Sequence, residues 1–129
     1  LEMVRVNVAA VVHLTRLFLP GMVARKHGRV LTVASTAAFQ PGPLMAGYYA
    51  SKAFVLSLSE ALSEELRGTG VTATTLCPGP TRTEFSAVAG ANGLRIFEGP
   101  NAVPSGPVAA AGVRGALRGT RVVIPGFLN

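Results

Sequence analysis

Apolar and polar side chains divide the chain into three helix-like and three strand-like stretches. Residues 3–27 are apolar almost throughout and end at Gly28, a residue type that often follows a helix, so they predict a mostly buried helix. Pro20 lies inside this stretch and should kink or interrupt it, because proline removes one hydrogen bond and clashes with the previous turn. Apolar residues at helical spacing predict a second helix over residues 46–67 and a small-residue helix over 105–118.

Short runs rich in β-branched residues predict strands over residues 29–35, 71–77 and 121–125. The first of these strands is expected to be buried on both faces of a sheet. Helices and strands therefore alternate with short connections, as a parallel α/β sheet requires, and the length of the chain suits one domain. Ligands bind beyond the carboxyl ends of parallel strands, which makes Ser35 and residues 78–85 candidates for a site.

The charge balance is basic, with 12 Lys and Arg against 6 acidic residues and a net charge of +6. A nucleic-acid partner would use such a charge and would show a steep salt dependence of affinity. The arginines are mostly scattered singly, however, and the one cluster, RKHGR at residues 25–29, follows the first helix, where cations interact favourably with the helix dipole. No aromatic residues alternate with these cations to stack on bases. We therefore expect no nucleic-acid partner.

Cys77 is the single cysteine, which excludes an internal disulfide and fits a reducing, cytoplasmic compartment. Its apolar neighbours predict a small core residue rather than a reactive thiol. The apolar stretch at residues 3–23 predicts a core helix rather than a membrane span, because polar residues and a proline interrupt it. The interruptions are Arg5, Asn7, His13, Arg16 and Pro20. The chain also opens on Leu1 within a helical pattern and without an N-cap signal, which predicts a truncated fragment.

Tyr48 and Lys52 are four residues apart on the second predicted helix, so both side chains lie on one face. Tyr49 is rotated by about 100° from Tyr48, which makes Tyr48 the better partner for the lysine. A phenol with a pKa near 10 is a weak acid or base at neutral pH, and an adjacent ammonium stabilises its phenolate. At about 4 Å and an effective dielectric of about 20 the charges attract by roughly 4 kcal/mol, an upper value equal to about three pKa units. The spacing thus predicts a Tyr48 pKa lowered toward neutral pH.

Two more polar residues join this candidate site. Ser35 ends the first strand and can hydrogen-bond a carbonyl oxygen, and Asn7 lies on an apolar helix face, where its amide must find a partner. Each residue also has an ordinary structural interpretation. Tyr48 can pack beneath the extended amine of Lys52, Ser35 can cap a loop, and Asn7 can be a satisfied core amide. Taken singly, none of them indicates catalysis.

Together, and with their spacing, these residues resemble the short-chain dehydrogenase/reductase family, and the resemblance extends over nearly the whole chain. The family has an Asn on the helix before a strand, a Ser thirteen residues before a Tyr, and a Lys four residues after it. The matching segments are VNVAA, VLTVASTAAF and YYASKAFV, which contain the tetrad Asn7, Ser35, Tyr48 and Lys52. The family's proline-glycine turn is similar to CPGPTRTEF, which would set four residues against the nicotinamide: Pro78, Gly79, Thr81 and Thr83.

The resemblance implies an NAD- or NADP-dependent oxidoreductase that moves hydride between nicotinamide and an alcohol or ketone. Tyr48 would exchange the proton on the substrate oxygen, and Lys52 would lower the tyrosine pKa and hold the ribose hydroxyls. Ser35 would position the substrate, and Asn7 would anchor a water linked to Lys52. The bulky Tyr49 departs from the family, which usually has a small residue after the tyrosine.

The resemblance also implies that residues 1–129 form a partial Rossmann-like domain, the carboxyl-terminal half of a doubly wound parallel sheet. The glycine-rich turn that receives the pyrophosphate does not occur in this sequence and would precede Leu1. The choice between NAD and NADP would lie in that half. Residues 85–97 match the family's substrate lid, or else a loop that covers the sheet edge, and their apolar side chains suit a moderately apolar substrate.

The main alternative is a non-catalytic fragment that acts as an interaction module. Its two long helices, residues 3–27 and 46–67, would dock on a partner or on a second copy of the chain. In the family these two helices commonly form the dimer interface, so a homo-oligomer is expected with or without catalysis. Stable self-association without dinucleotide affinity would favour this alternative.

Overall fold

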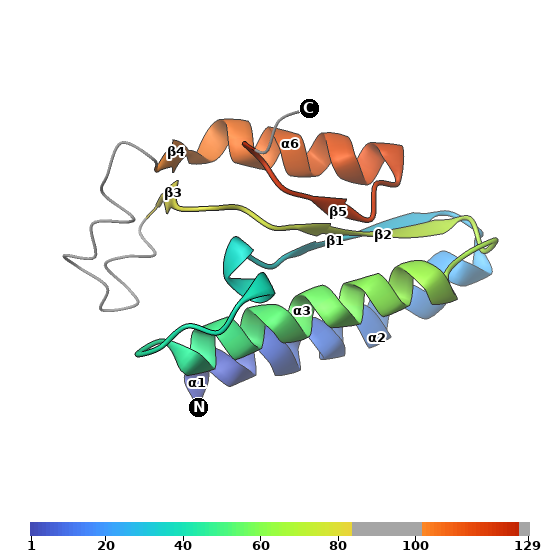
Figure 1. Ribbon diagram of the computed structural model, residues 1–129. Coiled ribbons are helices and arrows are strands. Elements are labelled where there is room, and N and C mark those ends of the chain that lie inside the picture. Colours follow the sequence, from blue (N-terminus) through green and yellow to red (C-terminus); the bar gives the residue numbers. More distant parts are fainter. Residues whose placement is uncertain (84–101, 127–129) are drawn as a thin grey trace.

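The computed structural model describes residues 1–83 and 102–126, and every structural statement below refers to them (Figure 1). The helices are α1 (Glu2–Val4), the π-helical turn η1 (Arg5–Ala9), α2 (Ala10–Ala24), the 3-10 turn η2 (Thr36–Phe39), α3 (Ala46–Glu65) and α6 (Ser105–Arg118). The strands are β1 (Gly28–Val33), β2 (Val71–Leu76), β3 (Thr81–Arg82), β4 (Val103–Pro104) and β5 (Val122–Val123). The expected alternation of helices and strands is confirmed.

The main sheet is parallel and has the strand order β1-β2-β5. Its register pairs Gly28 with Val71 at one end of β1 and Val33 with Leu76 at the other. Figure 1 shows three layers, with α2 and α3 on one face of the sheet and α6 on the other. This arrangement brings the carboxyl ends of β1 and β2 to one edge, where the chain leaves both strands.

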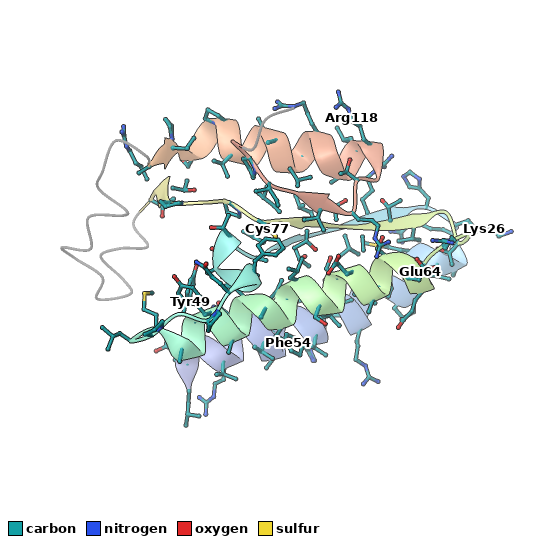
Figure 2. All side chains as sticks on the ribbon, viewed as in Figure 1. Lys26, Tyr49, Phe54, Glu64, Cys77 and Arg118 are labelled. Carbon is teal, nitrogen blue, oxygen red and sulfur yellow. The ribbon has the colours of Figure 1, made fainter. Side chains whose placement is uncertain are left out.

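Strand β2 lies in the centre of the sheet, and side chains of the core fill the space between the sheet and α3 (Figure 2). Two groups of buried apolar residues pack between β2 and α3. One consists of Ala34, Val55, Leu56 and Cys77, and the other of Leu62, Leu66, Val71 and Ala73. The prediction that Cys77 is a core residue is confirmed, since its side chain is fully buried.

The first helical stretch is much less buried than its apolar sequence predicted. No residue of α1, η1 or α2 is buried, and Leu17 is 63% exposed. Pro20 lies inside α2 and does not interrupt it. Pro20 and Arg16 are both exposed, so water can solvate the Arg16 carbonyl that the proline leaves without a donor.

Strand β1 also differs from its prediction, because it is not buried on both faces. Its residues alternate in exposure, and Leu31 and Val33 are exposed. β1 is also the edge strand of the described sheet, since β2 pairs with one side of it and no described strand pairs with the other. An edge strand with apolar side chains is a surface at which further chain can pair.

Residues 2–24 are long and apolar enough to cross a membrane by length and composition. Core helices of soluble proteins meet the same criterion, so the expectation of a core helix rather than a membrane span stays a prediction. A second small sheet pairs β3 with β4, and Val103 N–H donates to the Pro80 carbonyl at 3.0 Å. The expected lid at residues 85–97 lies outside the described residues.

Candidate active site

A cavity of about 650 Å³ lies at the carboxyl ends of β1 and β2. The residues expected at the site all line this cavity: Asn7, Ser35, Tyr48, Lys52, Pro78, Gly79, Thr81 and Thr83. They come from η1, from the segment after β1, from α3 and from the segment after β2 that includes β3. The structure therefore brings these eight residues together, while their catalytic roles stay predictions.

Ser35 lies two residues after the end of β1, rather than within the strand as expected, and joins the two strand ends. Its hydroxyl accepts a hydrogen bond from Ala37 N–H at 3.1 Å, which caps the 3-10 turn η2, as its structural interpretation predicted. The hydroxyl also lies 3.4 Å from the Pro78 carbonyl oxygen and hydrogen-bonds the Tyr48 side chain. Ser35 thus combines a capping role with a position beside the tyrosine hydroxyl.

The two tyrosines occupy different positions at the start of α3. Their ring centroids are 6.0 Å apart and their planes meet at 79°. The Tyr49 ring lies against Gly42, where an added Cβ would come within 2.3 Å of the ring, and it also borders a second cavity of about 670 Å³. The Lys52 amine lies over the Tyr48 ring, 5.8 Å from its centroid. The predicted pairing of Tyr48 with Lys52 is confirmed.

The prediction of a lowered Tyr48 pKa is wrong for this structure. Burial raises the pKa of Tyr48, the hydrogen bond with Ser35 partly opposes this rise, and Tyr49 adds to it. The Lys52 amine donates instead to the Val33 carbonyl at 3.0 Å, and burial lowers its pKa while Cys77 opposes that effect. At neutral pH the Tyr48 phenol therefore keeps its proton.

Asn7 sits in the π-helical turn η1, a local widening of the helix that is frequent at functional sites. Its Nδ2 donates to Ser51 Oγ at 3.1 Å, and Ser51 Oγ donates to the Tyr48 carbonyl at 2.7 Å. The amide therefore has the partner that its place on an apolar face required. Ser51 was missed by sequence reasoning, although its place immediately before Lys52 gave a signal.

The turn after β2 forms the opposite wall of the cavity. Thr36 N–H donates to the Pro78 carbonyl at 2.9 Å, and the Thr81 hydroxyl donates to the Gly79 carbonyl at 2.9 Å. Sequence reasoning also missed the contribution of α6, which supplies Ser105, Val108 and Ala109 to the lining. A helix packed across the sheet leaves no local sequence signal of that contact.

The lining fits the nicotinamide end of a dinucleotide. Its volume is in the ordinary range of small-molecule sites, and apolar residues supply most of its walls. A Cβ added to Gly79 would meet no atom within 4 Å, so a flat ring can approach this part of the backbone. Lys52, Thr81 and Thr83 offer an amine and two hydroxyls to a ribose and a carboxamide.

Comparison with known proteins identifies the family. The family model described as short chain dehydrogenase matches residues 1–92. The chain belongs to the short-chain dehydrogenase family. The uncharacterized oxidoreductase YvaG of Bacillus subtilis (strain 168) is 47% identical to it over 79 residues, which are 61% of this chain and 30% of YvaG. The very-long-chain 3-oxoacyl-CoA reductase of Bos taurus is 37% identical over 87 residues, 67% of this chain and 28% of the reductase.

Among solved structures, the short-chain dehydrogenase from Sphingobium yanoikuyae in complex with NADPH aligns with a TM-score of 0.87 and 29% identity. The alignment covers 98% of this chain and 48% of that dehydrogenase. The chain is thus similar to part of a dehydrogenase domain and spans about half the length of this structure and less than a third of the curated relatives described above. Its placement in the carboxyl-terminal half stays a prediction.

Proposed function

We propose that this chain carries the catalytic part of an NAD- or NADP-dependent oxidoreductase that transfers hydride between nicotinamide and an alcohol or ketone. The observation that supports this most is the single cavity that gathers the tetrad Asn7, Ser35, Tyr48 and Lys52 with the turn of residues 78–83. Each residue alone has a structural interpretation. Their convergence at the carboxyl edge of a parallel sheet is what a catalytic site of this family requires.

In the proposed reaction Tyr48 acts as the acid that protonates a carbonyl oxygen. Its raised pKa keeps the phenol protonated at neutral pH, which suits carbonyl reduction better than alcohol oxidation. Ser35 lies beside the same hydroxyl and can donate to the substrate oxygen, so the two groups fix that oxygen from two directions. A bound nicotinamide dinucleotide supplies the hydride.

Lys52 has two tasks in this proposal, namely binding ribose hydroxyls and stabilising the phenolate as the proton leaves. Its amine reaches the cavity while bonded to the Val33 carbonyl, so it has protons left for other acceptors. Approach of the amine to the phenol oxygen would lower the Tyr48 pKa by the Coulomb attraction expected from the sequence. Asn7 would hold a water that links Lys52 to solvent.

The relatives suggest, without fixing, the cofactor and the substrate class. The Sphingobium enzyme is described in complex with NADPH, and a gluconate 5-dehydrogenase from Beutenbergia cavernae, 31% identical, is described with bound NADP. A dehydrogenase from Comamonas testosteroni, 26% identical, is described as specific for bulky-bulky ketones. A moderately apolar ketone also suits the apolar lining of the cavity, which favours it as the first substrate class to test.

The test compares Tyr48→Phe with the matched control Tyr49→Phe in the native protein that contains this chain. The intact mass of the protein in its source cells is measured first, and the species with that mass is the one expressed for the assay. Reduction of a ketone panel is then followed by loss of NADPH or NADH absorbance. We expect Tyr48→Phe to lower kcat by about 10²- to 10⁴-fold, the range for a lost acid, and Tyr49→Phe to retain activity. The opposite result would reject Tyr48 as the acid.

A second function has its own supporting observation, the apolar surface on the long helices. Leu14, Leu17 and Phe18 of α2 and Phe54 of α3 are exposed large apolar residues. We propose that α2 and α3 mediate self-association of the protein, with or without catalysis. Sedimentation of wild type and a Leu17→Glu variant tests this, and a wild-type monomer across micromolar concentrations would reject it.

A further inference from the structure

Ser51 lies between the two long helical segments, beside the proposed tetrad but outside it. It is 4% exposed and stands on α3 between Tyr48 and Lys52. Its hydroxyl has two hydrogen-bond partners, the Tyr48 carbonyl oxygen at 2.7 Å and Asn7 Nδ2 at 3.1 Å. The first bond stays within α3, and the second crosses to the π-helical turn η1. Ser51 therefore connects the segment that carries Asn7 to the helix that carries Tyr48 and Lys52.

The protons available in this pair of bonds fix the orientation of the Asn7 amide. A serine hydroxyl has one proton to donate and two lone pairs that accept. The Tyr48 carbonyl can only accept, so the Ser51 proton goes to it. The atom of Asn7 that faces Ser51 Oγ must then donate, which assigns it as Nδ2 and leaves Oδ1 on the other side of the amide as an acceptor.

We propose that Ser51 is a positioning residue that sets the rotation of the Asn7 amide in the cavity. This inference rests on the proposed function, because the rotation of the amide matters only if Asn7 Oδ1 has to accept a hydrogen bond near Tyr48 and Lys52. Serine bonds to the carbonyl of an earlier turn are common in helices and have no catalytic meaning by themselves. The cross-helix bond is what gives this serine a role, since it engages one N–H of the Asn7 NH₂ group and so holds the amide in one rotation.

Kinetics of the intact enzyme test this role, with Ser51→Ala and Asn7→Ala made singly and together. Loss of one hydrogen bond of ordinary strength predicts a fall in kcat of roughly 5- to 10-fold for Ser51→Ala. If Ser51 acts through Asn7, the double variant falls no further than Asn7→Ala alone, within about 2-fold. Ser51→Thr keeps the hydroxyl and is expected to restore most of the activity.

Ser59→Ala is the matched control on the same helix. Ser59 is 1% exposed and its hydroxyl has no hydrogen-bond partner among the described residues, so its removal costs no bond. We expect this variant to leave kcat and KM unchanged. The proposal would be overturned if Ser51→Ala had the same kcat as Ser59→Ala. It would also be overturned if the falls in kcat of Ser51→Ala and Asn7→Ala multiplied in full in the double variant.

An NMR measurement separates failure of this inference from failure of the proposed function. Nuclear Overhauser contacts between the Asn7 side-chain NH₂ protons and the Ser51 β protons are expected in the wild type, whatever its turnover. Their absence, with Oδ1 facing Ser51 instead, would overturn the amide assignment while Tyr48-dependent turnover stood. Turnover of no alcohol or ketone would reject the proposed function and the positioning role with it, even if the contacts were present.

Discussion

Gly115 of α6 offers a stability test in which one helix supplies both the variant and its control. A Cβ added at Gly115 would lie 2.3 Å from Val123 Cγ2 on β5, closer than real side-chain contacts allow. Val123 is a β-branched residue on a strand, so its rotamer cannot change freely. Gly115→Ala must therefore move α6 away from the sheet or force an unfavourable rotamer.

The size of this effect follows from two opposing contributions. Overpacking of a buried contact costs about 1–3 kcal/mol, whereas replacing glycine by alanine in a helix gains roughly 1 kcal/mol. At Gly106, in the first turn of the same helix, an added Cβ meets nothing within 4 Å, so only the gain applies. We expect Gly106→Ala to raise the free energy of unfolding and Gly115→Ala to lie about 1–3 kcal/mol below it.

Urea unfolding followed by far-UV circular dichroism measures this difference. Equal m-values for the two variants would show that the change lies in stability rather than in the extent of unfolding. If both variants shifted the midpoint upward by the same amount, the contact between α6 and β5 would not be as close as described. The reasoning about packing across the sheet would then be refuted.

Three further predictions concern the tyrosine, the open strand edge and a tight turn. In a Tyr49→Phe variant of this chain Tyr48 is the only tyrosine, and absorbance at 295 nm should show a pKa above the ordinary value of about 10, because burial favours the neutral phenol. Leu31→Lys should reduce aggregation measured by light scattering, because a charge on the exposed edge strand opposes pairing with another chain. Gly70→Ala should destabilise the fold by about 1–3 kcal/mol in urea unfolding, because Gly70 has φ +81° and its Cβ would lie 2.1 Å from the Lys26 carbonyl oxygen.

Each of these predictions has an outcome that contradicts it. A tyrosinate transition below pH 10 would contradict the burial of Tyr48. Since a raised folded-state pKa adds stability that is present below pH about 10 and lost at higher pH, stability should also fall in that alkaline range. Unchanged scattering by Leu31→Lys would place the association surface elsewhere, and Gly68→Ala, at φ +78° with open space around it, separates backbone strain from the clash at Gly70.

Local sequence patterns determined most of the elements and the candidate site. The helix expected at residues 46–67 spans Ala46–Glu65, and the strand expected at 71–77 spans Val71–Leu76. The four-residue spacing of Tyr48 and Lys52 was enough to place them together, because helix geometry depends only on neighbouring residues. The sequence also indicated a parallel sheet, and in a parallel sheet the residues that follow neighbouring strands meet at one edge.

Only the tertiary structure decided which side chains are buried, the direction of the Tyr48 pKa shift and the hydrogen bond between η1 and α3. The same apolar composition that predicted a buried strand at residues 29–35 belongs to an exposed edge strand, because burial depends on what packs alongside. The raised pKa of Tyr48 reflects its burial, which the hydrogen bond with Ser35 only partly offsets. The bond from Asn7 to Ser51 joins residues 44 positions apart. Such contacts are set by folding in three dimensions, and no local periodicity encodes them.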